Sequence, residues 1–138
     1  MPFNRLDSKL SASPQLTPDD VAAAAAQGFR TIIDLRPDGE EPGQPAAATI
    51  DAAARKHGLA FIHIPVVPGQ VGDAHVDAMT RALDEKPGPA LGYCRSGTRV
   101  ATLWALGHAG KVDADTLVTT ARDAGYDLEK LRPRLQSA

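Results

Sequence analysis

The sequence has one cysteine, few aromatic residues and no long apolar run, and each shortage excludes a class of protein. Of 138 residues, one is cysteine and 4% are aromatic. A lone thiol cannot form an internal disulfide and is typical of a reducing compartment. No apolar stretch approaches the ~20 residues that cross a bilayer, and residues 1–9 are charged without an apolar signal region. We therefore expect a cytoplasmic protein with no membrane partner.

Neither sign of charge dominates the chain. Fifteen Lys and Arg residues stand against 17 Asp and Glu residues, which gives a net charge of −2 at pH 7. A chain without a basic stripe has no bulk electrostatic attraction for nucleic acid, so we expect no nucleic-acid partner. The length and the 43% hydrophobic share predict one globular domain over residues 1–138.

Short β-branched segments alternate with segments of helical period, and this pattern predicts an α/β domain whose mostly parallel central sheet is flanked by helices. The expected strands are residues 9–12, 31–35, 60–64 and 90–93. Thr17 and Asp73 are the expected N-caps of the first and third helices. The remaining helices are expected at residues 46–57, directly after Gly97, and at residues 114–124 and 128–135. The loop 36–45, rich in Pro and Gly, leaves the carboxyl end of a strand and should border the active site.

The segment CRSGTR, from Cys94 to Arg99, lies between an expected strand and an expected helix. A loop over a helix N-terminus directs several backbone N–H groups at one point, which attracts anions. These amides and the nearby arginines should favour the Cys94 thiolate, which would make it a nucleophile. We expect the anion cup to consist of Arg95, Ser96, Gly97, Thr98 and Arg99.

Two residues of the cup have specific roles in this interpretation. Gly97 allows a positive φ and leaves room for a bound group. Arg99 can direct its planar fork at an anion held in the cup. The alternative is an unreactive packed cysteine with two solvated arginines, but packing does not require a glycine and two arginines within six residues of a thiol.

The spacing within the loop separates two chemistries. Cysteine phosphatases place five residues between Cys and Arg, whereas rhodanese-type sulfurtransferases place four, as between Cys94 and Arg99 here. Phosphatases also need an acid to protonate the leaving oxygen, and residues 65–69 contain none. Asp73 and Asp77 come later and are expected to be an N-cap and a solvated helix residue. Sulfur transfer needs no such acid, because a thiol of low pKa leaves as thiolate.

Several ordered motifs together resemble the beta-lactamase hydrolase-like, phosphatase-like family over residues 3–110. They are LSAS (10–13), the TPDD helix start (17–20), AQGF (26–29), IIDLRPDGEEPGQP (32–45), HIPVVPG (63–69) and YCRSGTR (93–99). The resemblance implies a dual-specificity-phosphatase-like fold and sulfurtransferase activity in persulfide metabolism, although some relatives are described as phosphatases. It also implies that Cys94 carries sulfur and that Arg36 and Glu40 lie in the facing loop. A surface ion pair is the alternative for Arg36 and Glu40.

The leading hypothesis from the sequence is a rhodanese-type sulfurtransferase that moves sulfane sulfur from thiosulfate or a persulfide to a thiol or cyanide acceptor through a Cys94 persulfide. A cysteine-dependent phosphatase and a non-catalytic anion or persulfide sensor are the alternatives. The resemblance also implies a persulfide dioxygenase, which is fused to some members of the family, and we expect such a partner of this chain to be a separate protein. The four histidines have no i, i+4 pair and no nearby Cys, so we expect no metal and no cofactor. His63 is expected to pack on its strand and Trp104 to lie in the core.

Overall fold

The computed structural model describes residues 3–136. Its strands are β1 (Asn4–Arg5), β2 (Leu10–Ser13), β3 (Thr31–Asp34), β4 (Ala60–His63) and β5 (Ala90–Tyr93). Its helices are α1 (Pro18–Ala26), α2 (Ala47–Lys56), α3 (Asp73–Glu85), α4 (Thr98–His108), α5 (Ala114–Asp123), the 3-10 helix η1 (Glu129–Leu131) and α6 (Arg132–Gln136). None of the helices within residues 3–136 is long and apolar enough to cross a membrane.

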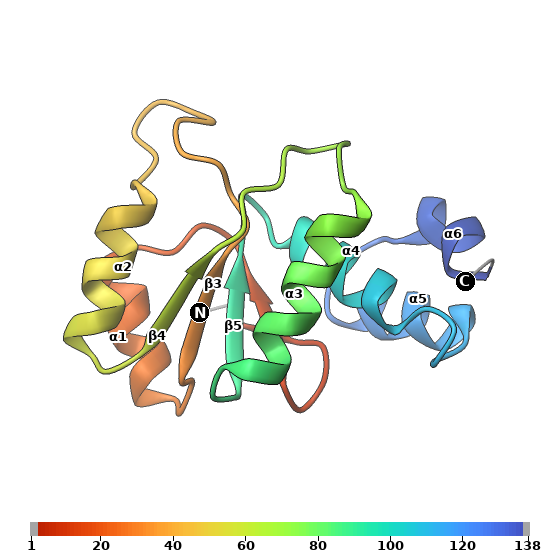
Figure 1. Cartoon of the computed structure of the whole chain (residues 1–138), viewed down its shortest axis with the longest axis horizontal. Helices are drawn as coiled ribbons and strands as arrows, with labels where there is room; N and C mark the ends of the chain where they lie inside the picture. The colour runs from red at the N-terminus through yellow and green to blue at the C-terminus, as the bar shows by residue number, and fades with distance from the viewer. Residues whose placement is uncertain (1–2, 137–138) are drawn as a thin grey trace.

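The elements form three layers, with one sheet between two layers of helices (Figure 1). The five strands follow the order β1-β2-β5-β3-β4, and all pairs are parallel except β1 with β2. Helices α1 and α2 pack together on one face, α3 and α4 pack together on the other, and α5 packs against α4. This arrangement confirms the predicted single α/β domain with a mostly parallel sheet.

Two apolar clusters, one for each face of the sheet, hold these layers together. Ile33, Val100 and Trp104 belong to the cluster under α3 and α4, as the helical spacing of Val100 and Trp104 predicts. Ile32 and Ile50 belong to the cluster under α1 and α2. Successive residues of β3 therefore contribute to opposite faces, which is expected of a strand that is buried on both sides.

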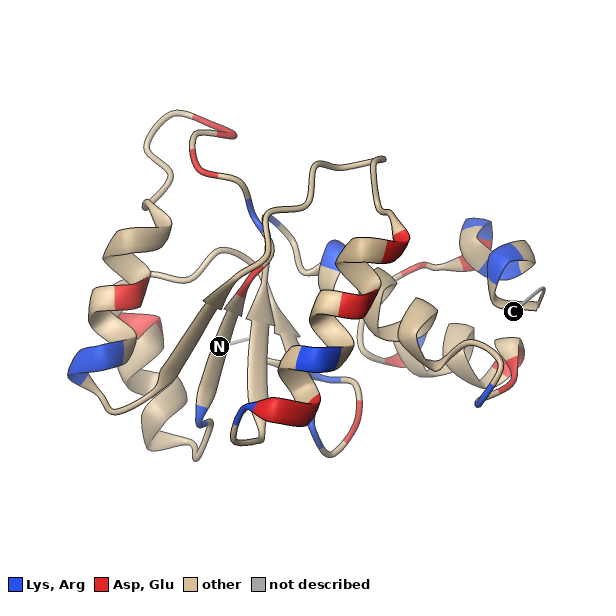
Figure 2. Cartoon of the chain, viewed as in Figure 1, with Lys and Arg blue, Asp and Glu red and all other residues tan. Residues whose placement is uncertain are grey.

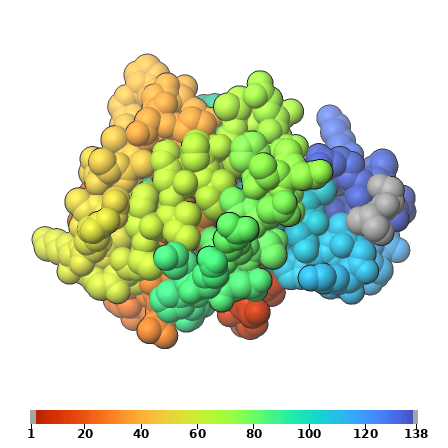
Figure 3. All heavy atoms as spheres, in the orientation of Figure 1, coloured from red at the N-terminus to blue at the C-terminus, as the bar shows by residue number. Residues whose placement is uncertain are grey.

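The register of the parallel strands brings three strand ends to one edge. Asp34 pairs with Tyr93 of β5 and with His63 of β4. The chain therefore leaves β3, β4 and β5 at the same edge, where α/β folds place their sites. The loop after β3 and the segment before α3 project from this edge on either side of a notch (Figure 3).

Three local features of the structure differ from the expectations. The two-residue strand β1 was not predicted, because two residues carry no detectable period. Gly72, and not Asp73, is the N-cap of α3: His75 accepts a hydrogen bond from the Gly72 N–H (3.1 Å), and Asp73 is the first helical residue. The helix expected at 128–135 is divided into η1 and α6, because Pro133 has no N–H to donate and is tolerated only in a first turn.

Candidate active site

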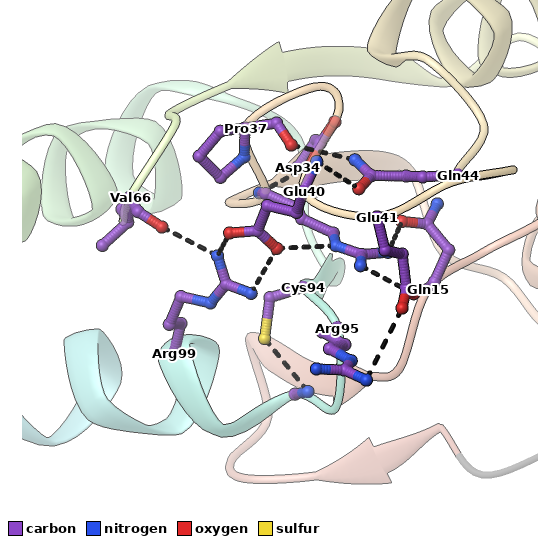
Figure 4. Close-up of polar contacts among 12 residues, drawn as sticks. Gln15, Asp34, Pro37, Glu40, Glu41, Gln44, Val66, Cys94, Arg95 and Arg99 are labelled. Carbon is purple, nitrogen blue, oxygen red and sulfur yellow. Dashed lines mark hydrogen bonds and ion pairs between the residues drawn. The ribbon is translucent and has the colours of Figure 1, made fainter. Parts of the chain in front are cut away.

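The Cys94 side chain lies at the N-terminus of α4, directly after β5. It is buried, and its Sγ accepts a hydrogen bond from the Gly97 N–H at 3.0 Å (Figure 4). Gly97 is the N-cap of α4 and has a φ of 103°, the left-handed region that glycine adopts at little cost. The N-terminus of a helix carries partial positive charge, so the loop around Cys94 attracts an anion. The strand–loop–helix arrangement of the predicted cup is therefore present.

A tyrosine far along the chain, Tyr126, lies directly against Gly97 of this loop. A Cβ at Gly97 would lie 2.3 Å from the Tyr126 hydroxyl oxygen, so Tyr126 also excludes a larger residue there. The same hydroxyl oxygen accepts a hydrogen bond from Asn4 Nδ2 at 2.9 Å. Burial raises the pKa of Tyr126. Sequence reasoning missed Tyr126, because only the folding of the C-terminal segment onto the loop brings it there.

The Arg99 guanidinium is buried beside Cys94 and is held by a carboxylate. Its Nη1 donates to Glu40 Oε2 (2.7 Å) and to the carbonyl oxygen of Val66 (2.8 Å), and its Nη2 donates to Glu40 Oε1 (2.8 Å). The fork that was expected to hold an anion in the cup therefore holds the Glu40 side chain. An anion that entered the cup would lie near the positive charge of Arg99, but both terminal nitrogens of Arg99 already donate hydrogen bonds.

Arg36 completes a buried ion cluster around Glu40. Its side chain is 1% exposed, and its Nε donates to Glu40 Oε1 at 2.7 Å. Its other nitrogens donate to Gln15 (3.0 Å) and Glu41 (2.8 Å). Glu40 thus joins two buried guanidinium groups, and these groups, Arg99 first, lower the pKa of the Glu40 carboxyl. The pairing of Arg36 with Glu40 is therefore largely buried, unlike the surface ion pair considered as an alternative.

The other three predicted cup residues lie on the exposed side of the loop. Arg95 is 71% exposed, with Nη2 3.5 Å from Glu41 Oε2. The hydroxyl oxygens of Ser96 and Thr98 are 3.0 Å apart, and both residues are exposed. The loop therefore has a buried half, with Cys94 and Arg99, and an exposed half that faces solvent.

Asp34 is a buried carboxylate at the edge of the site that sequence reasoning did not select. Its Oδ1 accepts a hydrogen bond from the Arg36 N–H at 2.7 Å, and burial raises the pKa of the carboxyl. Its strand neighbour Tyr93 has a buried hydroxyl with no hydrogen-bond partner of good geometry within residues 3–136, and burial followed by the Asp34 charge raises the pKa of that hydroxyl. A strand-end Asp beside a loop is the only sequence signal that could have indicated this pair.

His63 was expected to pack on its strand, but it does not. Its side chain is partly exposed, and its Nε2 lies 2.9 Å from the Arg36 carbonyl oxygen and 3.7 Å from Asp34 Oδ2. Trp104 lies in the core as expected, with its indole N–H donating to Asp7 at 2.8 Å. Within the part of the chain that the structure describes, no group of three or more His, Cys, Asp or Glu side chains is arranged to hold a metal ion.

Comparisons with known proteins agree with this geometry. The family model for the beta-lactamase hydrolase-like protein, phosphatase-like domain, matches residues 2–111. The beta-lactamase hydrolase-like protein of Xylella fastidiosa (strain Temecula1) is 38% identical over 125 residues, which are 89% of this chain. A protein of the same name from Agrobacterium fabrum is 35% identical over 126 residues, 90% of this chain. The chain spans 29% of the length of each of these relatives.

Solved structures share the fold. A candidate phosphatase from Neisseria meningitidis has a TM-score of 0.92 and 36% identity, over 99% of this chain and 98% of its own. TpbA of P. aeruginosa, solved with phosphotyrosine, has a TM-score of 0.63 and 20% identity over 96% of this chain and 90% of its own. At this identity the likeness shows a shared fold and nothing more. The dual-specificity-phosphatase-like fold that the sequence motifs implied is therefore confirmed. With the family model matching 2–111 and the Cys94 loop in place, this chain belongs to the family of the beta-lactamase hydrolase-like protein, phosphatase-like domain.

Proposed function

We propose that this chain is a cysteine-dependent phosphatase in which Cys94 is the nucleophile. The observation that carries the proposal is the position of Cys94 Sγ, 3.0 Å from the Gly97 N–H at the positive end of α4. Two structural relatives support phosphorus chemistry, because the Neisseria meningitidis protein is described as a candidate phosphatase and TpbA was solved with phosphotyrosine. Phosphate transfer thus replaces sulfur transfer, the leading hypothesis from the sequence, as the first candidate.

The proposed reaction has two steps. The Cys94 thiolate attacks phosphorus, the ester P–O bond breaks with its electron pair on the leaving oxygen, and a cysteinyl phosphate forms. Water then attacks phosphorus, the S–P bond breaks, and inorganic phosphate and the thiolate are released. Backbone N–H groups of the loop stabilise the charge on the phosphoryl oxygens in both steps, and the buried Arg99 charge lies beside them.

The proton for the leaving oxygen limits the substrate class. Glu40 and Glu41 have lowered pKa values and are poor acids, and residues 65–69 contain no Asp or Glu. Asp34 has a raised pKa, but it is buried with an oxygen already bonded to the Arg36 N–H. We therefore expect aryl phosphates of acidic phenols, which leave without a proton, to react much faster than alkyl phosphates.

Sulfur transfer remains a second candidate because two features of the sequence favour it. Only four residues separate Cys94 from Arg99, and the loop has no acid in the 65–69 turn. In this reaction the Cys94 thiolate attacks the outer sulfur of thiosulfate or a persulfide, the S–S bond breaks, and sulfite or a thiolate leaves. A thiol or cyanide then removes the sulfur from the Cys94 persulfide. A persulfide dioxygenase would be a partner only in this second candidate reaction.

The test is a comparison of turnover with the two donor classes. We expect hydrolysis of p-nitrophenyl phosphate, little hydrolysis of an alkyl phosphate, and no hydrolysis by Cys94→Ser. If thiosulfate with cyanide turns over while p-nitrophenyl phosphate does not, the second candidate is correct. If neither donor turns over but anions bind, the chain is the sensor that the sequence left open.

A further inference from the structure

Tyr126 reaches the Cys94 loop from a part of the chain that the family model does not cover. The match spans residues 2–111, and Tyr126 follows α5. This C-terminal segment packs on α4 through α5 and α6, on the side of α4 away from α1 and α2 (Figure 1). The segment carries charges of both signs along its length (Figure 2), yet the Tyr126 side chain is only 6% exposed. Tyr126 is therefore a buried contact between this segment and the loop.

The Tyr126 hydroxyl oxygen lies between the loop and the first strand of the sheet. It accepts a hydrogen bond from Asn4 Nδ2 of β1 at 2.9 Å, and a Cβ on Gly97 would lie only 2.3 Å from it. Burial raises the pKa of Tyr126, the bond from Asn4 opposes this change, and the charge of Cys94 adds to it. The hydroxyl is thus fixed by β1, pressed against Gly97 and close enough to Cys94 to interact with it.

Gly97 needs a neighbour to hold its conformation. Glycine adopts positive and negative φ about equally, so the residue itself does not select the φ of 103° at which its N–H meets Cys94 Sγ at 3.0 Å. Earlier in the loop, the Arg95 carbonyl oxygen accepts a hydrogen bond from the Gln15 N–H at 3.3 Å. After Gly97 the chain enters α4. Between these two fixed points, the hydroxyl of Tyr126 restricts where the Gly97 Cα can move.

We propose that Tyr126 is a positioning residue of the Cys94 loop. Its hydroxyl oxygen, fixed by Asn4, keeps the Gly97 peptide turned so that the N–H points at the thiol. Without this contact the peptide between Ser96 and Gly97 rotates more freely, and the loop loses a donor where the anion binds. The proposal rests on the proposed function only in taking Cys94 as the reacting group. Tyr126 acts through Gly97 and is not itself catalytic.

Hydrogen exchange of the Gly97 N–H, followed by NMR, measures how often this peptide turns away from the sulfur. Tyr126→Phe keeps the ring and removes the hydroxyl, so we expect this N–H to exchange about fivefold faster, while the N–H groups inside α4 keep their rates. Tyr93→Phe is the matched control, because Tyr93 is also buried and its hydroxyl has no hydrogen-bond partner of good geometry within residues 3–136. An unchanged rate in Tyr126→Phe, an equal rise throughout α4, or the same rise in Tyr93→Phe would overturn the proposal.

Asn4→Ala tests whether Asn4 fixes the hydroxyl, and it leaves Tyr126 in place. We expect exchange of the Gly97 N–H to become about twofold faster in this variant, and no further rise when Asn4→Ala is added to Tyr126→Phe. Additive effects would show that Asn4 does not act through Tyr126 and would overturn the arrangement. The single variant keeps the proposal falsifiable if Tyr126→Phe does not fold.

Turnover separates a failure of this proposal from a failure of the phosphatase proposal. We expect Tyr126→Phe to lower kcat for p-nitrophenyl phosphate about fivefold and to change KM less than twofold, because the Gly97 N–H acts on charge that develops in the transition state. Faster exchange in Tyr126→Phe, with a wild-type protein that hydrolyses no aryl phosphate, would refute the phosphatase and keep the positioning role. Faster exchange with an unchanged kcat, or unchanged exchange whatever the activity, would refute the positioning role.

Discussion

Replacing Glu40 by Gln tests whether charge holds the buried cluster together. Gln has nearly the same shape, but it has one acceptor oxygen and an NH₂ group that donates. The Glu40 carboxylate accepts three hydrogen bonds, one from Arg36 and two from Arg99, at 2.7–2.8 Å. In the variant at least one guanidinium N–H would face another donor, and two buried positive charges would lose the anion between them.

The expected loss of stability follows from these three bonds. A hydrogen bond to a charged group contributes about 1.5–3 kcal/mol and a neutral one about 0.5–1.5 kcal/mol, so three bonds lose about 3 kcal/mol. Part of this is recovered, because the Glu40 side chain is 18% exposed and Arg99 keeps the Val66 carbonyl oxygen. We therefore expect Glu40→Gln to lower the free energy of unfolding by about 2 kcal/mol at neutral pH.

Urea unfolding of both proteins at neutral and acid pH is the assay. Arg99 holds the pKa of the folded Glu40 carboxyl below its ordinary value, so its stabilisation is complete above the unfolded pKa and disappears as the pH falls through the folded pKa. The difference between wild type and variant should therefore vanish in acid. Glu41→Gln, at a side chain that is 42% exposed, should lose less. A variant as stable as the wild type at neutral pH, or a difference that persists in acid, would refute the reasoning.

Two further substitutions test other parts of the site. Gly97→Ala should lower the free energy of unfolding by about 1–3 kcal/mol, because the φ of 103° strains alanine and the Tyr126 hydroxyl leaves no room for a Cβ. In urea unfolding, adding Tyr126→Phe should recover only part of this loss. Asp34→Asn should raise stability at neutral pH but not in acid, because a raised folded pKa means that the charged carboxyl costs stability as the pH rises through that value. A gain for Asp34→Asn that is equal at both pH values would show that burial of its charge is not the cause.

Local signals in the sequence are sufficient to predict most of the fold. The β-branched strands, the TPDD helix start and the strand–loop–helix around Cys94 each occupy a few adjacent residues, so propensity and spacing indicate them. Thr17 caps α1 as predicted, with its hydroxyl oxygen accepting from the Asp20 N–H at 3.2 Å. Asp73 is not a cap, because Gly72 has the extended backbone of an N-cap and the helix begins at Asp73 itself.

The long-range contacts that shape the site could not be predicted. Glu40 and Arg99 are 59 positions apart, and nothing in either segment indicates that the fork of Arg99 takes the Glu40 carboxylate. Tyr126 reaches Gly97 only because the C-terminal segment folds back onto the loop. Such contacts depend on how helices pack, which short-range patterns do not encode. The sequence could therefore select Cys94, Arg99, Arg36 and Glu40 as candidate site residues, but not the contacts that join them or the position of Tyr126.

The intact mass of the protein after brief incubation with each donor tests the central claim most directly, since Cys94 is the only cysteine and both candidate reactions leave their group on it. We predict a gain of about 80 Da, a phosphoryl group, after acid quenching of a reaction with p-nitrophenyl phosphate, and no gain in Cys94→Ser. A gain of about 32 Da from thiosulfate, with no phosphoryl adduct from the aryl phosphate, would contradict the phosphatase and assign sulfur transfer to this loop.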